Sequence, residues 1–294
     1  MTMRELNHQQ RESVLDVLCE RSESLRAAGV EESRLCAELL VSEGIRCPRL
    51  ELPLVYNDPV PSDQATRISD WGARVASGEP IQYVLGWTSF RGHRIRTDRR
   101  ALIPRPETEE LVSHVLTSAS ARPDESLCVA DVGTGTGCIS IALCLECASM
   151  RLLGFDTEED ALSLARENRD AHGLISRIDF VRSDLLESVV DCSLDYVVSN
   201  LPYITEAQMA ELPTHVRDHE PVSALVAGQD GLDVIRRCIP EARRCLKPGG
   251  MIFLEIGIYQ GDAVQGILKK SGFEEVRVSL DLSGRVRIAQ GRVP

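Results

Sequence analysis

A glycine-rich turn between an apolar strand and an apolar helix constrains the fold of this 294-residue chain most strongly. The run Val129–Val132 predicts a buried strand, Gly133–Gly137 follows it, and Ile139–Leu143 has the character of a buried helix. Glycines tolerate positive φ and let a ligand approach the backbone closely. A dinucleotide fingerprint would need glycine at Cys138, so the spacing D-x-G-x-G-x-G disfavours a nicotinamide oxidoreductase.

Acidic residues end the next two predicted strands. Asp156 follows the run 151–155, and Asp184 follows the run 179–183. The carboxyl ends of parallel strands border the ligand crevice of an open α/β sheet, where Asp156 can accept hydrogen bonds from both hydroxyls of a ribose. Asp184 is placed to reach the amino group of adenine. Either acid alone is more simply a solvated strand end, but with the glycine turn the two predict a nucleoside site.

A further strand-like run, 194–199, ends in the tetrapeptide Asn200-Leu201-Pro202-Tyr203. Asn200 carries a carbonyl acceptor and an NH2 donor on a short stem. Together with the Leu201 carbonyl and the Tyr203 ring, it would form a socket for a planar group that bears an NH2. A simple strand-to-loop turn closed by Asn and Pro is the alternative. The nucleoside site predicted upstream favours the socket.

The chain begins with helical patterns and continues with alternating strands and helices. Three helices are predicted in its first part, at about residues 8–28, 32–42 and 62–76. Two strands, Ile81–Phe90 and His93–Asp98, are then expected on either side of a turn at Arg91-Gly92. The strands that close the sequence are predicted at residues 250–256, 275–281 and 285–290. The alternation predicts an α/β fold with a doubly wound sheet.

The formal net charge of −12 is spread unevenly. Residues 1–100 carry 14 basic and 15 acidic side chains, whereas residues 101–294 carry 19 and 30. Because phosphate contacts dominate the affinity of proteins for nucleic acids, the acidic second part argues against a nucleic-acid duplex as the main partner. One basic cluster, opposed only by Asp98, predicts either a solvated hairpin face or a docking patch for an acidic or RNA-associated partner. Its members are Arg91, Arg94, Arg96, Arg99, Arg100 and Arg105.

Hydropathy and cysteine usage predict a cytoplasmic protein without a metal. No run approaches the ~18 apolar residues of a transmembrane helix, and residues 1–10 lack the apolar core of a signal peptide. Ten cysteines without disulfide-scaffold spacing point to a reducing compartment. Cys144 and Cys147 form a single C-x-x-C, with no second pair or histidine cluster to complete a zinc site.

The glycine turn resembles motif I of the S-adenosylmethionine-dependent methyltransferases. Three further segments resemble the release factor glutamine methyltransferases in particular: Glu79–Gly86, Leu102–Glu109 with its I-P-R-P-E-T-E signature, and Glu220–Leu225. That family N5-methylates the Gln of the Gly-Gly-Gln tripeptide in class I peptide chain release factors. The resemblance covers nearly the whole chain.

This resemblance implies a seven-stranded Rossmann-like class I methyltransferase sheet and a small N-terminal helical domain, joined by a β-hairpin. The implied domains are residues 1–78 for release-factor recognition, 79–103 for the hairpin linker and 104–294 for the methyltransferase. The implied cofactor is S-adenosyl-L-methionine, with S-adenosyl-L-homocysteine as product. The implied partners are class I release factors, with neither a membrane nor a direct nucleic-acid substrate.

The same resemblance implies roles for individual residues. Cofactor contacts are expected from Gly133, Thr134, Gly135, Thr136, Gly137, Asp156, Asp184, Leu185 and Asn200. Catalytic roles are expected for Asn200, Pro202 and Tyr203, and Leu201 joins them in binding the substrate. We infer that the Asn200 side-chain oxygen and the Leu201 carbonyl each accept one N–H of the substrate amide. Tyr203 would stack on the amide plane, and Pro202 would fix the loop. Arg105 and Glu107 lie in a segment that lines the site in relatives.

Two residues depart from the family pattern. Leu201 occupies the first Pro position of N-P-P-Y, which frees φ and adds an N–H, and Leu185 stands where some relatives carry Trp. Two other functions are compatible with the motifs: an amino-methyltransferase acting on a nucleic-acid base, and a non-catalytic S-adenosylmethionine-binding protein. The acidic second part of the chain argues against the first, and the presence of Asn200, Pro202 and Tyr203 argues against the second.

Overall fold

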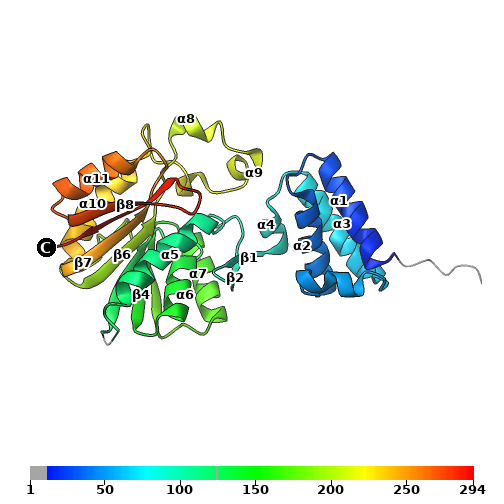
Figure 1. The fold of residues 1–294 in the computed structure, drawn as a ribbon, viewed down its shortest axis with the longest axis horizontal. Helices are drawn as coiled ribbons and strands as arrows, with labels where there is room; N and C mark the ends of the chain where they lie inside the picture. The colour runs from blue at the N-terminus through cyan, green and yellow to red at the C-terminus, as the bar shows by residue number, and fades with distance from the viewer. Residues whose placement is uncertain (1–11, 124) are drawn as a thin grey trace, which may run out of the picture. The chain divides into compact units, whose positions relative to one another are not determined.

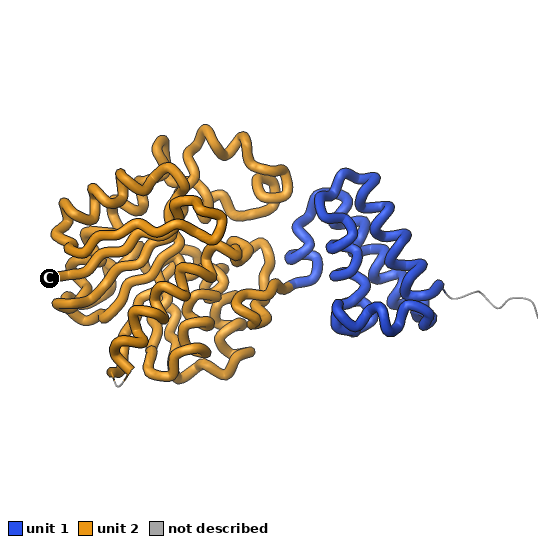
Figure 2. Tube along the Cα trace, in the orientation of Figure 1, with its two compact units in different colours: residues 1–86 blue, residues 87–294 orange. Residues whose placement is uncertain are grey.

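The computed structural model describes residues 12–123 and 125–294, and the chain divides into two compact units, Met1–Gly86 and Trp87–Pro294 (Figures 1 and 2). We call them the helical unit and the sheet unit. The start of the first predicted helix, at residues 8–11, and the segment inspected for a signal peptide lie outside the described residues. Among the residues that are described, no helix combines the length and apolar character needed to cross a membrane.

The helical unit packs its helices around a small apolar core. Its elements are α1 (Val14–Ala27), α2 (Ser33–Ile45), the 3-10 helix η1 (Arg49–Val55), α3 (Ser62–Ala76) and α4 (Ile81–Leu85). Helix α1 begins with a capping box, in which the Ser13 hydroxyl accepts from the Asp16 N–H and the Asp16 carboxylate accepts from the Ser13 N–H. Leu18, Leu40 and Ile68 are fully buried in the core. The three helices predicted in this part are thus present, whereas η1 was not predicted.

The predicted strand Ile81–Phe90 is wrong over its first half. Residues 81–85 form α4, and only Trp87–Phe90 is a strand, β1, which pairs with β2 (His93–Arg96) around the turn at Arg91-Gly92. Pro80 precedes α4 and Gly86 ends it with φ of 77°. The Pro before this segment and the Gly after it favour a helical turn, and they outweigh the periodicity that suggested a strand. Because α4 belongs to the helical unit, the division falls after Gly86, beyond the predicted boundary at residue 78.

The sheet unit contains seven strands in the order β5-β4-β3-β6-β7-β9-β8. They are β3 (Leu127–Val132), β4 (Met150–Asp156), β5 (Ile178–Arg182), β6 (Leu194–Asn200), β7 (Leu246–Glu255), β8 (Glu274–Leu280) and β9 (Val286–Arg292). The strands from β5 to β7 are parallel, and β9 runs antiparallel to both of its neighbours. This arrangement confirms the prediction of a seven-stranded Rossmann-like methyltransferase sheet.

Helices cover both faces of this sheet. The longer ones are α5 (Pro106–Ala119), α6 (Cys138–Glu146), α7 (Glu159–Ala171), α10 (Asp233–Cys245) and α11 (Gly261–Lys270). Figure 1 shows α5, α6 and α7 on one face and α10 and α11 on the other. Side chains alternate accordingly along β3, where Val129 belongs to the core beneath α5–α7 and Ala130 to the core beneath α10 and α11. Three short elements, α8 (Glu206–Met209), α9 (Thr214–Arg217) and η2 (Val222–Ala224), separate β6 from α10.

The order of the strands places a ligand crevice between β3 and β6. The chain adds β4 and β5 on one side of β3, and then returns to add β6 and β7 on the other. Open α/β sheets bind ligands at such a reversal, outside the carboxyl ends of the strands. Val132 is the register partner of Ser199, so the two strands end side by side. Gly133 and Asn200 therefore begin neighbouring loops.

Several arginines of the predicted basic cluster are engaged within the sheet unit. Arg91 donates to both carboxylate oxygens of Glu146 at 2.6 Å, and Arg100 donates to Asp98 and Glu167. Arg96 lies 3.5 Å from Glu167, and Arg105 bonds to Glu220. These pairs join the hairpin and the segment after it to α6, α7 and the loop before η2. Arg91, Arg100 and Arg105 thus serve the internal structure, which disfavours a docking role for them.

A matched pair of substitutions on α6 tests this arrangement. Leu143 is fully buried between α6 and the sheet, whereas Leu145, two residues on, is 38% exposed. We expect Leu143→Ala to lower the free energy of unfolding by about 2–5 kcal/mol, as a cavity in a core does. Leu145→Ala should change it by roughly 0.5 kcal/mol or less. Urea denaturation followed by circular dichroism measures both, and equal effects of the two substitutions would contradict the placement of α6.

Candidate cofactor and substrate site

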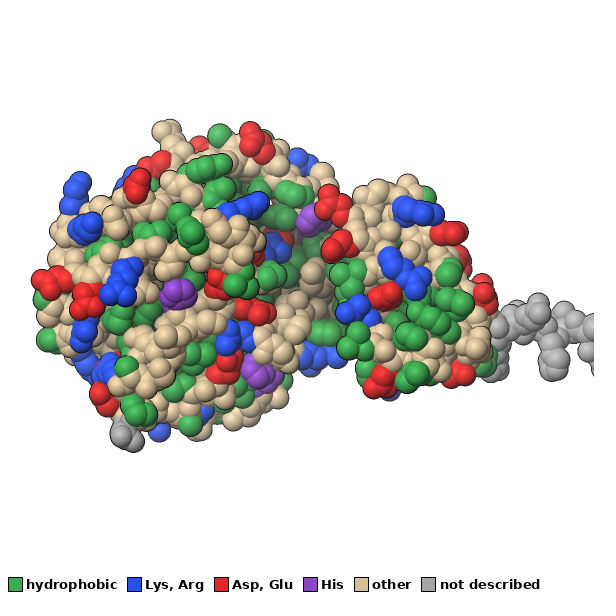
Figure 3. Space-filling view, in the orientation of Figure 1, with side chains coloured by type: hydrophobic (Ala, Val, Ile, Leu, Met, Phe, Trp, Pro, Cys, Tyr) green, Lys and Arg blue, Asp and Glu red, His purple; other side chains and the backbone are tan. Residues whose placement is uncertain are grey.

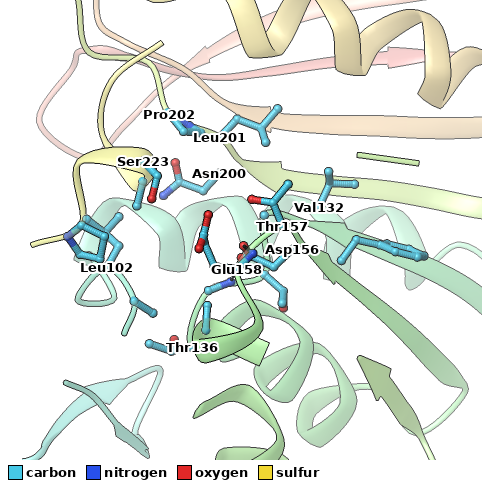
Figure 4. Close-up of a pocket in the computed structure, with 18 of the residues that line it drawn as sticks. Leu102, Val132, Thr136, Asp156, Thr157, Glu158, Asn200, Leu201, Pro202 and Ser223 are labelled. Atoms are coloured by element: carbon cyan, nitrogen blue, oxygen red, sulfur yellow. Dashed lines mark hydrogen bonds between the residues drawn. The ribbon is translucent and has the colours of Figure 1, made fainter. Parts of the chain in front are cut away.

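A cavity of about 330 Å³ lies at the carboxyl ends of β3, β4 and β6. Figure 4 shows Asp156, Glu158 and Asn200 around this space, with Leu102 and Ser223 on one side of it. Its volume falls in the range of small-molecule sites in proteins. Ten predicted site residues line it: Gly133, Thr134, Gly135, Thr136, Asp156, Asp184, Leu185, Asn200, Leu201 and Pro202. Gly137 and Tyr203 do not.

The glycine loop follows β3 with its backbone turned toward the cavity. The N–H groups of Gly133 and Thr134 both donate to the Phe155 carbonyl, at 2.8 and 2.9 Å. Gly133 and Gly135 have φ of 70° and 54°, which residues with a side chain rarely adopt. Gly137 instead precedes α6, and a Cβ on it would lie 3.0 Å from Phe180 and 3.2 Å from Ala165. Packing against β5 and α7 thus explains this third glycine.

Asp131, the first residue of the D-x-G-x-G-x-G motif, fixes the glycine loop by accepting hydrogen bonds from it and from the start of α6. Its Oδ2 accepts from the hydroxyls of Thr134 and Ser140, both at 2.7 Å, and from the Ser140 N–H at 3.2 Å. Burial raises the pKa of Asp131 to about 6. Its Oδ1 is buried and has no hydrogen-bond partner among the described residues. Asp131 does not line the cavity, but its neighbours Val132 and Thr134 do, so an ionised Asp131 adds negative charge close to the site and favours a cationic ligand there.

Asp156 and Asp184 both border the cavity but differ in their surroundings. Asp156 accepts from the Gly135 N–H at 3.0 Å and from the Glu158 N–H at 3.1 Å, and burial raises its pKa. Each carboxylate oxygen can accept more than one bond, so Asp156 can still bind the two hydroxyls of a ribose. Asp184 forms an ion pair with Arg237 of α10, with its Oδ2 at 2.6 Å from the guanidinium. Arg237 also lines the cavity and was not predicted.

The tetrapeptide Asn200–Tyr203, which we call the catalytic loop after its predicted role, is held by a buried hydrogen-bond network that the sequence did not predict. The Asn200 Nδ2 donates to the Thr108 hydroxyl at 3.0 Å, and this hydroxyl donates to Glu255 Oε2 at 2.6 Å. The Tyr203 hydroxyl donates to the other oxygen, Glu255 Oε1, at 3.3 Å. Glu255 ends β7 and is 2% exposed. The carboxylate thus connects the first and last residues of the tetrapeptide.

An ion pair joins the two segments that cover the cavity. Arg105, in the I-P-R-P-E-T-E signature, donates to Glu220 Oε1 at 2.5 Å, and the Ile103 N–H donates to Glu220 Oε2 at 3.3 Å. The Glu220 side chain is completely buried. Residues 100–105 and 221–224 both contribute to the lining. Two segments noted only for their resemblance to a family thus meet over one site.

Two known protein families match consecutive parts of this chain. The family described as PrmC N-terminal domain matches residues 16–86, and the family described as methyltransferase small domain matches residues 108–215. A release factor glutamine methyltransferase from Nitratidesulfovibrio vulgaris is 37% identical over 91% of this chain and 91% of its own. One from Cereibacter sphaeroides is 38% identical over 92% of this chain and 95% of its own. This chain belongs to the release factor glutamine methyltransferase family.

Solved structures of more distant methyltransferases share the fold of the sheet unit. A Thermus thermophilus 16S rRNA N2 G1207 methyltransferase, solved with AdoMet and guanosine, is 16% identical, covers 71% of this chain and 50% of its own, and has a TM-score of 0.51. A methyltransferase from Pyrococcus furiosus is 15% identical, covers 79% and 98%, and has a TM-score of 0.50. At these identities the comparison supports the fold alone.

The family assignment confirms the prediction of an S-adenosylmethionine-dependent methyltransferase, and the cavity fits that cofactor. The glycine loop lets a ligand reach the backbone, Asp156 offers acceptors for a ribose, and Asp131 favours positive charge. No group of three or more His, Cys, Asp or Glu side chains in the described part of the chain could hold a metal ion. The individual cofactor contacts stay predictions.

Removal of the Asp156 carboxylate tests its expected contact with the ribose. A hydrogen bond to a charged group contributes about 1.5–3 kcal/mol. We therefore expect Asp156→Ala to weaken binding of S-adenosylhomocysteine by roughly ten- to hundredfold, as measured by isothermal titration calorimetry. Glu159→Ala, an exposed acid at the start of α7, is the matched control and should bind as the parent does. An unchanged dissociation constant for Asp156→Ala would show that the ribose lies elsewhere.

Proposed function

We propose that this enzyme transfers a methyl group from S-adenosyl-L-methionine to the side-chain amide nitrogen, N5, of the Gln in the Gly-Gly-Gln motif of class I peptide chain release factors. The names of its relatives support this substrate, since proteins 37% and 38% identical over nine-tenths of the chain are release factor glutamine methyltransferases. The observation that carries the proposal is the position of Asn200, Leu201 and Pro202 on the wall of the cofactor cavity. The partner is therefore a protein that presents a glutamine.

The loop after β6 offers two acceptors to a primary amide. The Asn200 amide gives its NH2 to Thr108, so its Oδ1 is available to accept one substrate N–H. The Leu201 carbonyl accepts the other, as expected from the sequence. An amide nitrogen is a poor nucleophile because its lone pair is delocalised into the carbonyl, so alignment has to supply much of the rate. Well-oriented reactants can gain about 7–11 kcal/mol from such alignment.

When bound, S-adenosyl-L-methionine would supply a methyl group on a positively charged sulfur. As the N–C bond forms, the S–C bond would break to give a neutral thioether, and the substrate nitrogen would lose one proton to solvent. The chain holds the acceptor nitrogen in line with that methyl group, and it excludes water with the covering segments that Arg105 and Glu220 join. The Tyr203 hydroxyl is fixed by Glu255, which leaves its ring as the candidate platform for the amide plane. No covalent intermediate with a side chain is required.

Other functions have less support. A base amino-methyltransferase needs a basic nucleic-acid face, but residues 101–294 carry 30 acidic and 19 basic side chains. On the face of the sheet unit seen in Figure 3, acidic and basic side chains are interspersed. A protein that only binds the cofactor would not need the hydrogen bonds that fix Asn200 and Tyr203 at the two ends of the catalytic loop. The ten cysteines are all free thiols, which fits the predicted cytoplasmic location.

Methylation of purified release factors tests the proposal. The chain should modify a factor that contains Gly-Gly-Gln and leave a Gly-Gly-Ala variant unmodified, as read by mass spectrometry of the product peptide. Asn200→Ala should lower kcat by on the order of 10²-fold or more, the effect of a misplaced positioning group. Its affinity for S-adenosylhomocysteine should stay within a few-fold. A methyl group on DNA, RNA or another side chain, with the Gln unmodified, would refute the proposal in favour of the nucleic-acid alternative.

The unusual residue of the loop gives a second test. Leu201→Pro restores the family pattern, fixes φ and removes an N–H. We expect this variant to fold and to turn over at least as fast as the parent, because a stiffer loop holds the carbonyl acceptor more firmly. Leu201→Gly, which loosens the loop, is the opposing variant and should be slower. A steady-state comparison of kcat decides the point, and a Leu201→Pro enzyme that folds but is inactive would show that the loop needs the freedom Leu gives it.

A further inference from the structure

The network behind the catalytic loop has a direction that its chemistry fixes. An ionised carboxylate only accepts hydrogen bonds, whereas a hydroxyl has a single proton to donate. The Thr108 hydroxyl donates that proton to Glu255 Oε2, with 2.6 Å between the two oxygens. Toward Asn200 it can therefore only accept, and it receives the Nδ2 group at 3.0 Å. The carboxylate at the end of β7 thus determines the orientation of an amide at the end of β6.

This orientation matters because the two ends of a carboxamide have opposite functions. With Nδ2 on Thr108, Asn200 presents its Oδ1, which forms no hydrogen bond with a described residue. In the reversed orientation Asn200 would present an NH2 group, which repels the N–H of a substrate amide. Nothing in the shape of Asn alone distinguishes the two, since O and N are nearly equal in size. The orientation of the Asn200 amide is therefore determined by its hydrogen-bond partner, the Thr108 hydroxyl.

We propose that Glu255, acting through Thr108, is a positioning residue that keeps the acceptor end of Asn200 turned toward the substrate amide. This inference rests on the proposed function, and it goes beyond it by assigning roles to two buried residues outside the catalytic loop. Thr108 lies in the first turn of α5 and is 2% exposed, as is Glu255. Neither lies in the loop. Glu255 does not line the cavity, so it acts on the reaction through Thr108, Asn200 and Tyr203. Thr108 does line the cavity, so the affinity of its variants for S-adenosylhomocysteine has to be measured beside kcat.

The second oxygen of Glu255 extends the same control to Tyr203. The Tyr203 hydroxyl donates to Oε1 at 3.3 Å, so one carboxylate fixes both ends of the tetrapeptide. Arg287 of β9 donates to the Tyr203 hydroxyl at 3.5 Å and to the Ile256 carbonyl at 3.3 Å. The positive charge of Arg287 lowers the pKa of Glu255. This arrangement requires Glu255 to be ionised.

The surroundings of Glu255 shift the pKa of its carboxyl group in both directions, with a net increase. Burial raises its pKa, as does the nearby Glu107 of α5, whereas the Thr108 bond, Arg287 and the Tyr203 bond lower it. The charge of Glu255 in turn raises the pKa of the buried Cys138 thiol of α6, although burial is the larger cause. With the pKa shifted upward, the proton binds as the pH falls, at a value above the ordinary 4.5. Protonated Glu255 can donate to Thr108, whose proton is then free to bond with Asn200 Oδ1, so kcat should fall on the acid side.

Three variants of the network test the inference with the full-length enzyme. Thr108→Val keeps the shape but removes the hydroxyl, and it should lower kcat by roughly 10²-fold, in line with a misplaced positioning group. Thr108→Ser restores the hydroxyl and should recover most of the rate. Thr117→Val, an exposed threonine on the same helix whose hydroxyl bonds only to the Ser113 carbonyl in the described structure, is the matched control and should match the parent.

Glu255→Gln separates this role from simple packing. Gln has nearly the same shape but can donate as well as accept, so the orientation of Asn200 is no longer fixed. We expect kcat to fall, the loss of activity toward acid pH to disappear, and the dissociation constant for S-adenosylhomocysteine to stay within a few-fold. A Glu255→Gln enzyme with the parental kcat and the parental acid limb would overturn the proposal.

A direct reading of Asn200 keeps the test independent of catalysis. In protein labelled with 15N-asparagine, the Asn200 NH2 protons, assigned by their absence in Asn200→Ala, should show cross-relaxation to the Thr108 methyl group. In Thr108→Ser, which lacks the methyl group, cross-relaxation to the β protons of the substituted side chain should replace this contact. In Glu255→Gln the contact with the Thr108 methyl group should weaken. Absence of the contact in the parent protein refutes the relay, whereas failure of the parent to methylate a Gly-Gly-Gln factor refutes the proposed function alone. The melting temperature of each variant identifies any that do not fold.

Discussion

The parallel pairing of β3 with β6 is the constraint on which the site depends. Val132 is the register partner of Ser199, and the Ser199 hydroxyl donates to the Val132 carbonyl, so both strands end at the same level. Gly133 therefore begins the cofactor loop beside Asn200, which begins the catalytic loop. A slip of one residue would turn every side chain of a strand to the opposite face. The two loops that we expect to hold the cofactor and the substrate amide thus lie side by side because two strands far apart in the sequence keep this register.

Buried acids lie around this junction, and burial raises the pKa of two of them, Asp131 and Glu255, so their ionised forms are held at a cost in stability. Asp131, Glu220 and Glu255 are at most 4% exposed. A buried carboxylate opposes folding unless hydrogen bonds compensate it. Asp131 has a pKa raised to about 6 from 3.8, so its favourable contribution is complete below 3.8 and is lost as the pH rises through 6. At neutral pH it destabilises the fold, yet it holds the glycine loop by accepting from Thr134 and Ser140. Asp131 thus orders the glycine loop while it lowers the free energy of unfolding at neutral pH.

Local sequence patterns predicted the fold and the walls of the site, because these features are written in contiguous residues. Glycines 133 and 135 have the positive φ that their spacing suggested, and Asp156 and Asn200 end their strands as predicted. Thr108 and Glu255 escaped prediction because they meet across 147 positions of sequence. Thr108 belongs to the I-P-R-P-E-T-E segment, but no local pattern in that segment indicates a contact with the glutamate that ends β7. Residues 81–85 were wrongly predicted as a strand although the relevant signal is local. Pro80 before them and Gly86 after them indicate a helical turn, and this signal was overlooked.

The departure at Leu201 is understandable in terms of what else holds the loop. Leu201 is buried, and a Cβ on Gly133 would lie only 3.3 Å from its side chain, so it packs against the cofactor loop. Beyond it, Gln260 donates to the Tyr203 carbonyl at 3.1 Å and accepts from the Gly257 N–H at 2.9 Å. Gly231 allows this close approach, because a Cβ there would lie 2.2 Å from the Tyr203 carbonyl oxygen. A second proline would restrict the backbone of this loop. Here the packing of Leu201 against Gly133 and the hydrogen bond from Gln260 to the Tyr203 carbonyl restrict it instead.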